Sequence, residues 1–94
     1  MRSYASIDRI EGLFAVCEIE LVPVEESANF TPFEKETEMV DLRVESITEV
    51  CGEVEEGDII ILEHDDDVNL ITVCEKDDTE KQRRIKLLEE IMNS

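Results

Sequence analysis

The stretch that decides the fold is Ile7-Asp8-Arg9-Ile10-Glu11-Gly12-Leu13-Phe14-Ala15-Val16-Cys17-Glu18-Ile19-Glu20. It predicts a β-hairpin, because two runs of alternating apolar and polar residues flank a segment that contains a glycine. A three-residue loop over 10–12, with Gly12 in the left-handed conformation, places the two strands at 4–9 and 13–22. The chain is therefore expected to begin with an antiparallel pair that founds a small β domain.

The register of this hairpin decides which face of each strand meets the core, because a slip of one residue exchanges the two faces. The three-residue loop pairs Arg9 with Leu13 and lays the Arg9 stem along an apolar face. A two-residue turn at 11–12 pairs Asp8 with Ala15 instead, which mixes polar and apolar groups on each face. We therefore expect the first register, with these side chains on the inner face: Ala5, Ile7, Leu13, Ala15, Cys17 and Ile19.

Further strands are predicted by alternation and by apolar runs. The segment 39–45 alternates as a half-buried strand, and 46–56 is expected to be irregular with a short helical turn. The unbroken aliphatic run 59–62 predicts the most central strand, buried on both faces. After a turn at 64–67, the segment 68–74 predicts the fifth strand.

The last element is predicted to be a helix over 77–92, capped by Asp77, Asp78 or Thr79. Its apolar side chains recur at spacings of three and four residues. Four basic residues in its first half are expected to neutralise the acidic body rather than to bind an anion: Lys81, Arg83, Arg84 and Lys86. The predicted fold class is α+β, a small five-stranded antiparallel curled sheet or partly open barrel closed by this helix through Ile85, Leu87, Leu88, Ile91 and Met92.

Length and composition favour a single folded domain over residues 1–94. The chain is 41% hydrophobic and only 4% aromatic, which predicts an aliphatic core. Its formal net charge is −17, and the acidity is concentrated before residue 76. Such a surface repels nucleic acids and anionic membranes and attracts basic protein surfaces. We therefore expect a basic protein surface as the partner, and neither direct nucleic-acid nor membrane binding.

Cysteine usage and hydropathy predict a reducing, cytoplasmic compartment. Cys17, Cys51 and Cys74 are odd in number and form no Cys-x-x-Cys pair, which argues against a disulfide framework and a zinc site. No apolar run is long enough for a spanning helix, and residues 1–6 lack the apolar core of a signal peptide.

The residue types of a catalytic or metal centre are sparse. The only histidine, His64, is predicted to be a solvated turn residue, so no base stands beside a nucleophile. The segment 65–69 copies the first ligand positions of an EF-hand loop, but Leu70 and Lys76 stand where the loop requires glycine and glutamate. We therefore predict no enzyme activity, no cofactor and no metal.

The loop 23–38 is long for a compact domain and contains Phe30 and Phe33, two of the four aromatic residues. Two interpretations remain open. The rings fold back to cover the end of the barrel, or they are apolar anchors among glutamates, as in a protein-binding hot spot. Alanine at both positions separates these interpretations, because an unchanged melting temperature would exclude the first. The candidate partner-binding residues are Phe30, Phe33, Glu34, Glu36 and Glu38.

Several motifs recur in matching order along most of the chain: Ile-Asp-Arg-Ile-Glu-Gly at 7–12, Ala-Val-Cys-Glu at 15–18, Glu-Gly-Asp-Ile-Ile at 56–60, and Arg-Arg-Ile at 83–85. Together they resemble a family of small bacterial proteins catalogued as a domain of unknown function (the 3006 type). The resemblance implies a short β domain with a charged C-terminal helix, and no activity. The family has a shorter loop than 23–38, so this loop is expected to carry what is particular to this protein.

Three functions fit these observations. The leading hypothesis is a non-catalytic acidic module that binds a basic surface of a partner protein. A sharper alternative is a nucleic-acid mimic that inhibits a DNA- or RNA-binding protein, as a phage-borne inhibitor of a CRISPR nuclease does. Carboxylates spaced like backbone phosphates on one face would favour it. The third is an accessory domain of a partner enzyme, which genomic neighbourhood would reveal.

Overall fold

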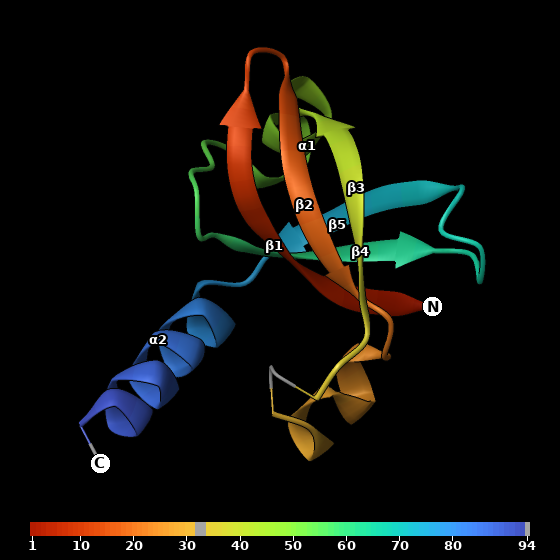
Figure 1. The fold of residues 1–94 in the computed structure, drawn as a ribbon. Coiled ribbons are helices and arrows are strands. Elements are labelled where there is room, and N and C mark those ends of the chain that lie inside the picture. Colours follow the sequence, from red (N-terminus) through yellow and green to blue (C-terminus); the bar gives the residue numbers. More distant parts are fainter. Residues whose placement is uncertain (32–33, 94) are drawn as a thin grey trace.

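The computed structural model describes residues 1–31 and 34–93. In this part of the chain, all strand pairs are antiparallel, and the strand order is β3-β2-β1-β4-β5. The first three strands form a meander and β4 returns beside β1, which is a Greek-key arrangement. The predicted α+β class and five-stranded curled sheet are confirmed, and the sheet is not closed. The elements are β1 (Arg2–Glu11), β2 (Phe14–Glu20), the 3-10 helix η1 (Val24–Asn29), β3 (Thr37–Arg43), α1 (Val44–Cys51), β4 (Ile59–His64), β5 (Ile71–Lys76) and α2 (Asp78–Met92) (Figure 1).

β1 and β2 form the expected hairpin, but its loop and register differ from the prediction. Glu11 pairs with Phe14, so the loop contains only two residues, Gly12 and Leu13. Gly12 has a φ of +58°, the left-handed conformation that the sequence predicts. Leu13 lies at the tip and is exposed, so its predicted place on the inner face is wrong.

A β-bulge preserves the inner face despite the different loop. The pairing shifts between Ile7 and Arg9, which leaves Asp8 as an extra residue in β1. Arg9 pairs with the carboxylates of Asp8 and Glu11, and its half-exposed side chain does not lie along the core, contrary to the prediction. The other predicted inner-face residues are buried: Ala5, Ile7, Ala15, Cys17 and Ile19.

The core lies between the curled sheet and α1. The run Ile59–Leu62 of β4 is buried along its whole length, as predicted, although β1 and not β4 is the middle strand. Residues 44–51, predicted as the end of the strand 39–45 and part of the irregular segment 46–56, form the two-turn helix α1. Its Ile47 is fully buried in the same cluster as Ile60 and Leu62. Because α1 contacts both edge strands, β3 and β5, it bridges the open side of the sheet.

The long loop after β2 is held by η1 and one buried lysine. The side chain of Lys35 is fully buried and donates to Ser27 Oγ at 2.7 Å and to Glu20 Oε1 at 3.3 Å. These contacts tie the returning limb of the loop to η1 and to the end of β2. Phe33 lies outside the described residues.

His64 ends β4 and is only 4% exposed, so its predicted place in a solvated turn is wrong. Its Nε2 lies 2.9 Å from Ser3 Oγ, and its Nδ1 lies 2.7 Å from the carbonyl oxygen of Asp65. Ser3 in turn donates to the carbonyl oxygen of Val22 at 2.9 Å. The histidine therefore joins β4 to β1, and Ser3 extends the contact to Val22, which follows β2.

The turn after β4 is longer than predicted, and β5 begins at Ile71. The Asp65 carboxylate accepts hydrogen bonds from the backbone N–H groups of Asn69 and Leu70. These bonds lower the pKa of the Asp65 carboxyl below its ordinary value. The carboxylate at the first position of the EF-hand-like segment is thus used to order the turn.

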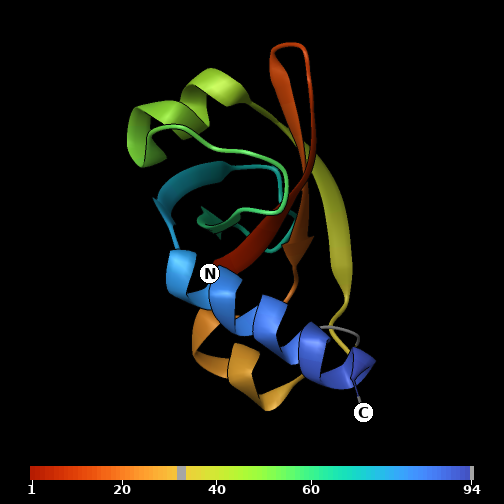
Figure 2. The same ribbon diagram turned by 90° about the vertical axis from the view of Figure 1, so that its left-hand side faces the viewer.

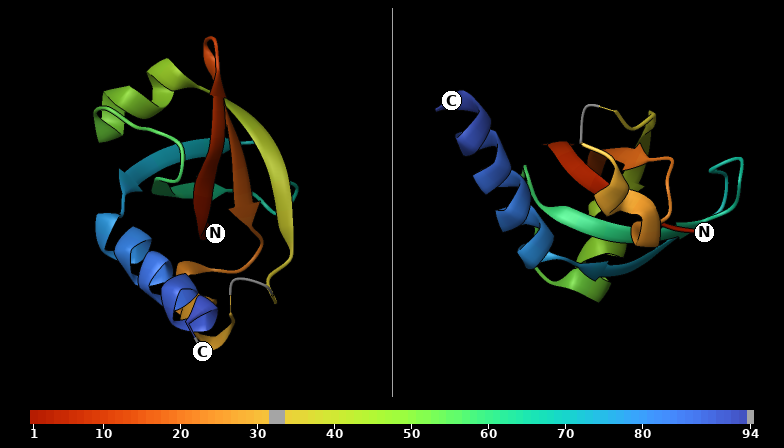
Figure 3. Two further views of the ribbon diagram at one scale, coloured as in Figure 1. Left: turned by 60° about the vertical axis from the view of Figure 1, so that its left-hand side comes forward. Right: turned by 90° about the horizontal axis from the view of Figure 1, so that it is seen from below.

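α2 begins as predicted but packs differently. Asp77 is the N-cap, and its carboxylate accepts a hydrogen bond from the backbone N–H of Glu80 at 2.9 Å. The expected closure of the barrel by an apolar side of this helix is wrong, because Ile85, Leu88, Ile91 and Met92 are exposed and only Leu87 is half-buried. Figure 1 and the right-hand view of Figure 3 show that the C-terminal half of α2 points away from the strands. Within the described ranges, neither helix is long and apolar enough to cross a membrane.

Candidate functional site

The basic side chains are largely occupied within the fold. Arg43 lies over the Phe14 ring, and Lys76 donates to the carbonyl oxygen of Glu53 at 3.2 Å. Only seven of the 26 carboxylates have an ion-pair partner in the described part of the chain, so 19 remain unneutralised there. The basic residues in ion pairs are Arg2, Arg9, Lys35, Lys81, Arg83 and Arg84.

Five of the unneutralised carboxylates gather at one edge of the sheet. β3 pairs with β2 and is an edge strand in the described sheet. On its outer face Met39 lies opposite Glu18, and Asp41 lies opposite Val16, the next position along β2 on that face. Met39 is 49% exposed, so an apolar side chain stands among acids. We call this surface the acidic edge: Glu18, Glu34, Glu36, Glu38 and Asp41.

The structure places four of the five predicted partner-binding residues. Glu34, Glu36 and Glu38 are exposed and belong to the acidic edge. Phe30 follows η1 and keeps 39% of its surface exposed, so it is not sealed in the core. That these residues bind a partner stays a prediction.

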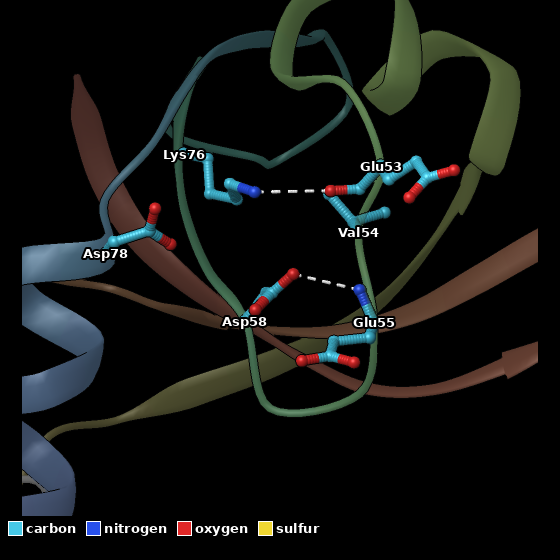
Figure 4. Close-up of a pocket in the computed structure, with 6 residues that line it drawn as sticks. All are labelled: Glu53, Val54, Glu55, Asp58, Lys76 and Asp78. Atoms are coloured by element: carbon cyan, nitrogen blue, oxygen red, sulfur yellow. Dashed lines mark hydrogen bonds between the residues drawn. The ribbon is translucent and has the colours of Figure 1, made fainter.

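A surface pocket of about 410 Å³ lies beside the start of α2, and two of its charged side chains, Asp58 and Lys76, are engaged in contacts within the fold (Figure 4). Asp58 accepts hydrogen bonds from the backbone N–H of Glu55 at 2.9 Å and from Lys81 at 2.7 Å. Lys76 on its far side is held by a backbone carbonyl. We therefore assign these side chains to fixing the loop before β4 and the start of α2.

The cysteines are free, as the sequence predicts, and two of them are poor nucleophiles. Burial raises the pKa of the Cys17 thiol to about 11, and the nearby Asp41 carboxylate adds to the shift. Burial also raises the pKa of Cys51. Because the thiolate is the reactive form, neither residue is activated.

Sequence reasoning missed a group of buried charges that fixes α2 to the sheet. Arg84 reaches from α2 to Glu20 of β2 at 2.9 Å and to Glu80 at 2.7 Å, and its guanidinium stacks over the Tyr4 ring. Burial alone would raise the pKa of Glu80, but hydrogen bonds from Arg83 and Arg84 outweigh it, and the pKa lies below its ordinary value. We call Glu20, Lys35, Glu80 and Arg84 the anchor network.

Comparisons with protein-family models, with curated protein sequences and with solved structures give no match for this chain. The resemblance to the domain-of-unknown-function family therefore stays a prediction. The function has to be argued from the geometry alone.

Acid is expected to destabilise the fold through Asp58 and Glu80. Burial raises the pKa of the Asp58 carboxyl, but hydrogen bonds from Lys81 and from the backbone N–H of Glu55 lower it by more. The pKa of Asp58 therefore lies below its ordinary value, as does that of Glu80. Carboxyls with a lowered folded pKa contribute stability that is complete above pH ~4, their unfolded value, and is lost as the pH falls through the folded pKa. Urea unfolding measured from pH ~7 to ~3 should show this loss.

Lys81→Met tests how much of this loss of stability in acid comes from Asp58, because it removes the cation that lowers the pKa of Asp58. The variant should lose less stability between neutral and acid pH than the natural protein does. Lys86→Met removes the same charge from the same helix and serves as the control. If both variants lose the same stability between neutral and acid pH, the contribution assigned to Asp58 is wrong.

Proposed function

We propose that this protein is a non-catalytic interaction module that uses its acidic edge to bind a basic surface of another protein. The observation that carries the proposal is the distribution of charge. The cations are mostly consumed by internal contacts, whereas the acidic edge has no ion-pair partner in the described structure. A basic partner can therefore bind without breaking contacts that hold the fold together.

Exposed apolar groups beside the acids support the same proposal. Met39 lies within the acidic edge and Phe30 lies in the loop that leads to it. Binding energy at protein interfaces is concentrated in a few apolar or aromatic anchors, while surrounding charges steer the encounter. Phe30 and Met39 are suited to be the anchors and the carboxylates to be the steering charges.

The same surface argues against direct nucleic-acid binding. Five-stranded, partly open Greek-key barrels include domains that bind oligonucleotides on the face of the second and third strands. Here that face carries Glu18 and Asp41, which repel phosphates. Because fold alone does not fix function, the charge of the face decides.

Binding of an oligolysine peptide by calorimetry tests the proposal. Association should weaken steeply between ~20 and ~150 mM salt, because the contacts are charged and exposed. The triple variant Glu34→Gln, Glu36→Gln, Glu38→Gln should bind about tenfold more weakly, from three surface pairs worth roughly 0.2–1 kcal/mol each. Phe30→Ala should weaken the binding of a partner protein and leave the melting temperature of this protein nearly unchanged.

The matched control removes three carboxylates from α1 and the loop that follows it: Glu45→Gln, Glu49→Gln and Glu53→Gln. These side chains are also exposed, and none has an ion pair within the described residues. Their loss should change the affinity far less than the loss of the acidic edge. If both triple variants weaken binding equally, the peptide senses only net charge and the acidic edge is not the site.

A further inference from the structure

The backbone at the free edge of β3 is oriented to accept another strand. The N–H of Leu21 donates to the carbonyl oxygen of Glu36, and the N–H of Val44 donates to that of Leu13, both at 2.9 Å. These two bonds bracket the β2–β3 ladder, in which hydrogen-bonded pairs alternate with non-bonded pairs. The even-numbered residues of β3 therefore bond to β2. The N–H and C=O groups of the odd-numbered residues 37–43 point to the free edge.

The side chains along this edge define what kind of strand would fit. On the outer face, Met39 and Asp41 are exposed, and Glu18 lies beside them on β2. On the inner face, Val40 and Leu42 are only half-buried and pack at the margin of the core. Side chains of an added strand alternate between the two faces. Its outward residues would therefore lie beside Met39, Asp41 and Glu18, with Arg43 at the end of that face. Its inward residues would lie beside Val40 and Leu42, with Glu38 at the start of that face.

We propose that β3 accepts an extended segment of a partner protein, with alternating basic and apolar residues, as a sixth strand of the sheet. This inference rests on the proposed function and names how the acidic edge is used. Strand addition supplies main-chain hydrogen bonds for affinity and alternate side chains for specificity. In Figure 2, β3 is the outermost strand on its side of the molecule, and no other described strand pairs with its free edge.

Charge argues for a basic partner rather than a second copy of this chain. Each copy carries a formal net charge of −17, and pairing β3 with β3 would bring two acidic edges together. Like charges at neighbouring positions of paired strands are destabilising. The carboxylates along β3 thus protect the edge from self-association while leaving it open to a cationic strand.

The test uses two synthetic peptides of equal composition, one alternating lysine and valine and the other with all lysines before all valines. The alternating peptide should slow hydrogen exchange of the Met39 and Asp41 amides and bind more tightly than the block peptide. Met39→Pro removes one outward N–H without breaking the β2–β3 ladder, since proline is tolerated where the N–H faces solvent on an edge strand. It should weaken binding of the alternating peptide about tenfold or more.

Met39→Ala is the matched reference, because it also removes the apolar anchor but keeps the N–H, and Met39→Pro should bind the alternating peptide about tenfold more weakly than Met39→Ala does. Thr37→Pro, at the first residue of the strand, replaces Met39→Pro if that variant does not fold. Peptide binding that is unchanged by either proline and leaves both amides unprotected would overturn strand addition while leaving the proposed function standing. Failure of both peptides to bind the natural protein at low salt would overturn the proposed function itself.

Discussion

Glu20→Leu is expected to cost about 3–5 kcal/mol of the free energy of unfolding, because it leaves a buried lysine without its counter-ion. Lys35 has a fully buried side chain, and Glu20 is its only ion-pair partner among the described residues. Its remaining hydrogen bond goes to a neutral hydroxyl, Ser27 Oγ. Small domains are stable by only about 5–15 kcal/mol, so the loss would be readily seen in urea unfolding.

A second substitution separates the cost of the orphaned charge from the loss of packing. In Glu20→Leu, Lys35→Met, the buried cation is gone, and apolar groups of similar volume fill the site. Replacing a buried ion pair in this way is often close to neutral, so the double variant should recover at least about 2 kcal/mol over the single one. Arg84 keeps Glu80 as a partner in both variants.

Glu18→Leu is the matched control for this series, since Glu18 lies on the same strand and face as Glu20 but has no ion pair in the described structure. Its substitution should change stability by no more than about 0.5 kcal/mol. If Glu20→Leu is equally mild, or if Lys35→Met restores nothing, the anchor network does not hold the loop and α2 in place.

The local rules of strand formation predicted much of the sheet. Alternation identified the inner face of β1 and β2, and the aliphatic run identified β4, because burial requires apolar residues at fixed periods. The hairpin register was wrong because the bulge at Asp8 adds one residue that no periodicity marks. His64 was misplaced for a related reason, since the hydroxyl that bonds it comes from β1, 61 residues away.

The candidate site divides in the same way. Glu34, Glu36 and Glu38 were predicted from the sequence as partner-binding residues, and their exposure is what glutamate side chains normally show. The burial of Lys35 between them could not be predicted, because a lysine is normally exposed and its partners come from η1 and β2. The free backbone of β3 likewise depends on strand order, which is a property of the whole sheet and not of residues 37–43.

The structure also reverses the prediction of which helix closes the barrel, and a pair of substitutions tests this. Ile47→Ala in α1 is expected to cost about 2–5 kcal/mol, because it empties a fully buried position in the core cluster. Leu88→Ala in α2 removes the same number of carbon atoms, yet should change the free energy of unfolding by no more than about 0.5 kcal/mol, because Leu88 is 46% exposed.

The two variants have opposite expectations under the two arrangements, so unfolding in urea decides between them. A barrel closed by α2 would make Leu88→Ala the costly change, through the loss of packing on the sheet. A barrel closed by α1 makes Ile47→Ala the costly change, because this helix bridges the two edge strands and its one buried side chain fills the space between them. The anchor network then explains how α2 stays attached although Ile85, Leu88 and Met92 are exposed, because Glu80 and Arg84 hold its first turns.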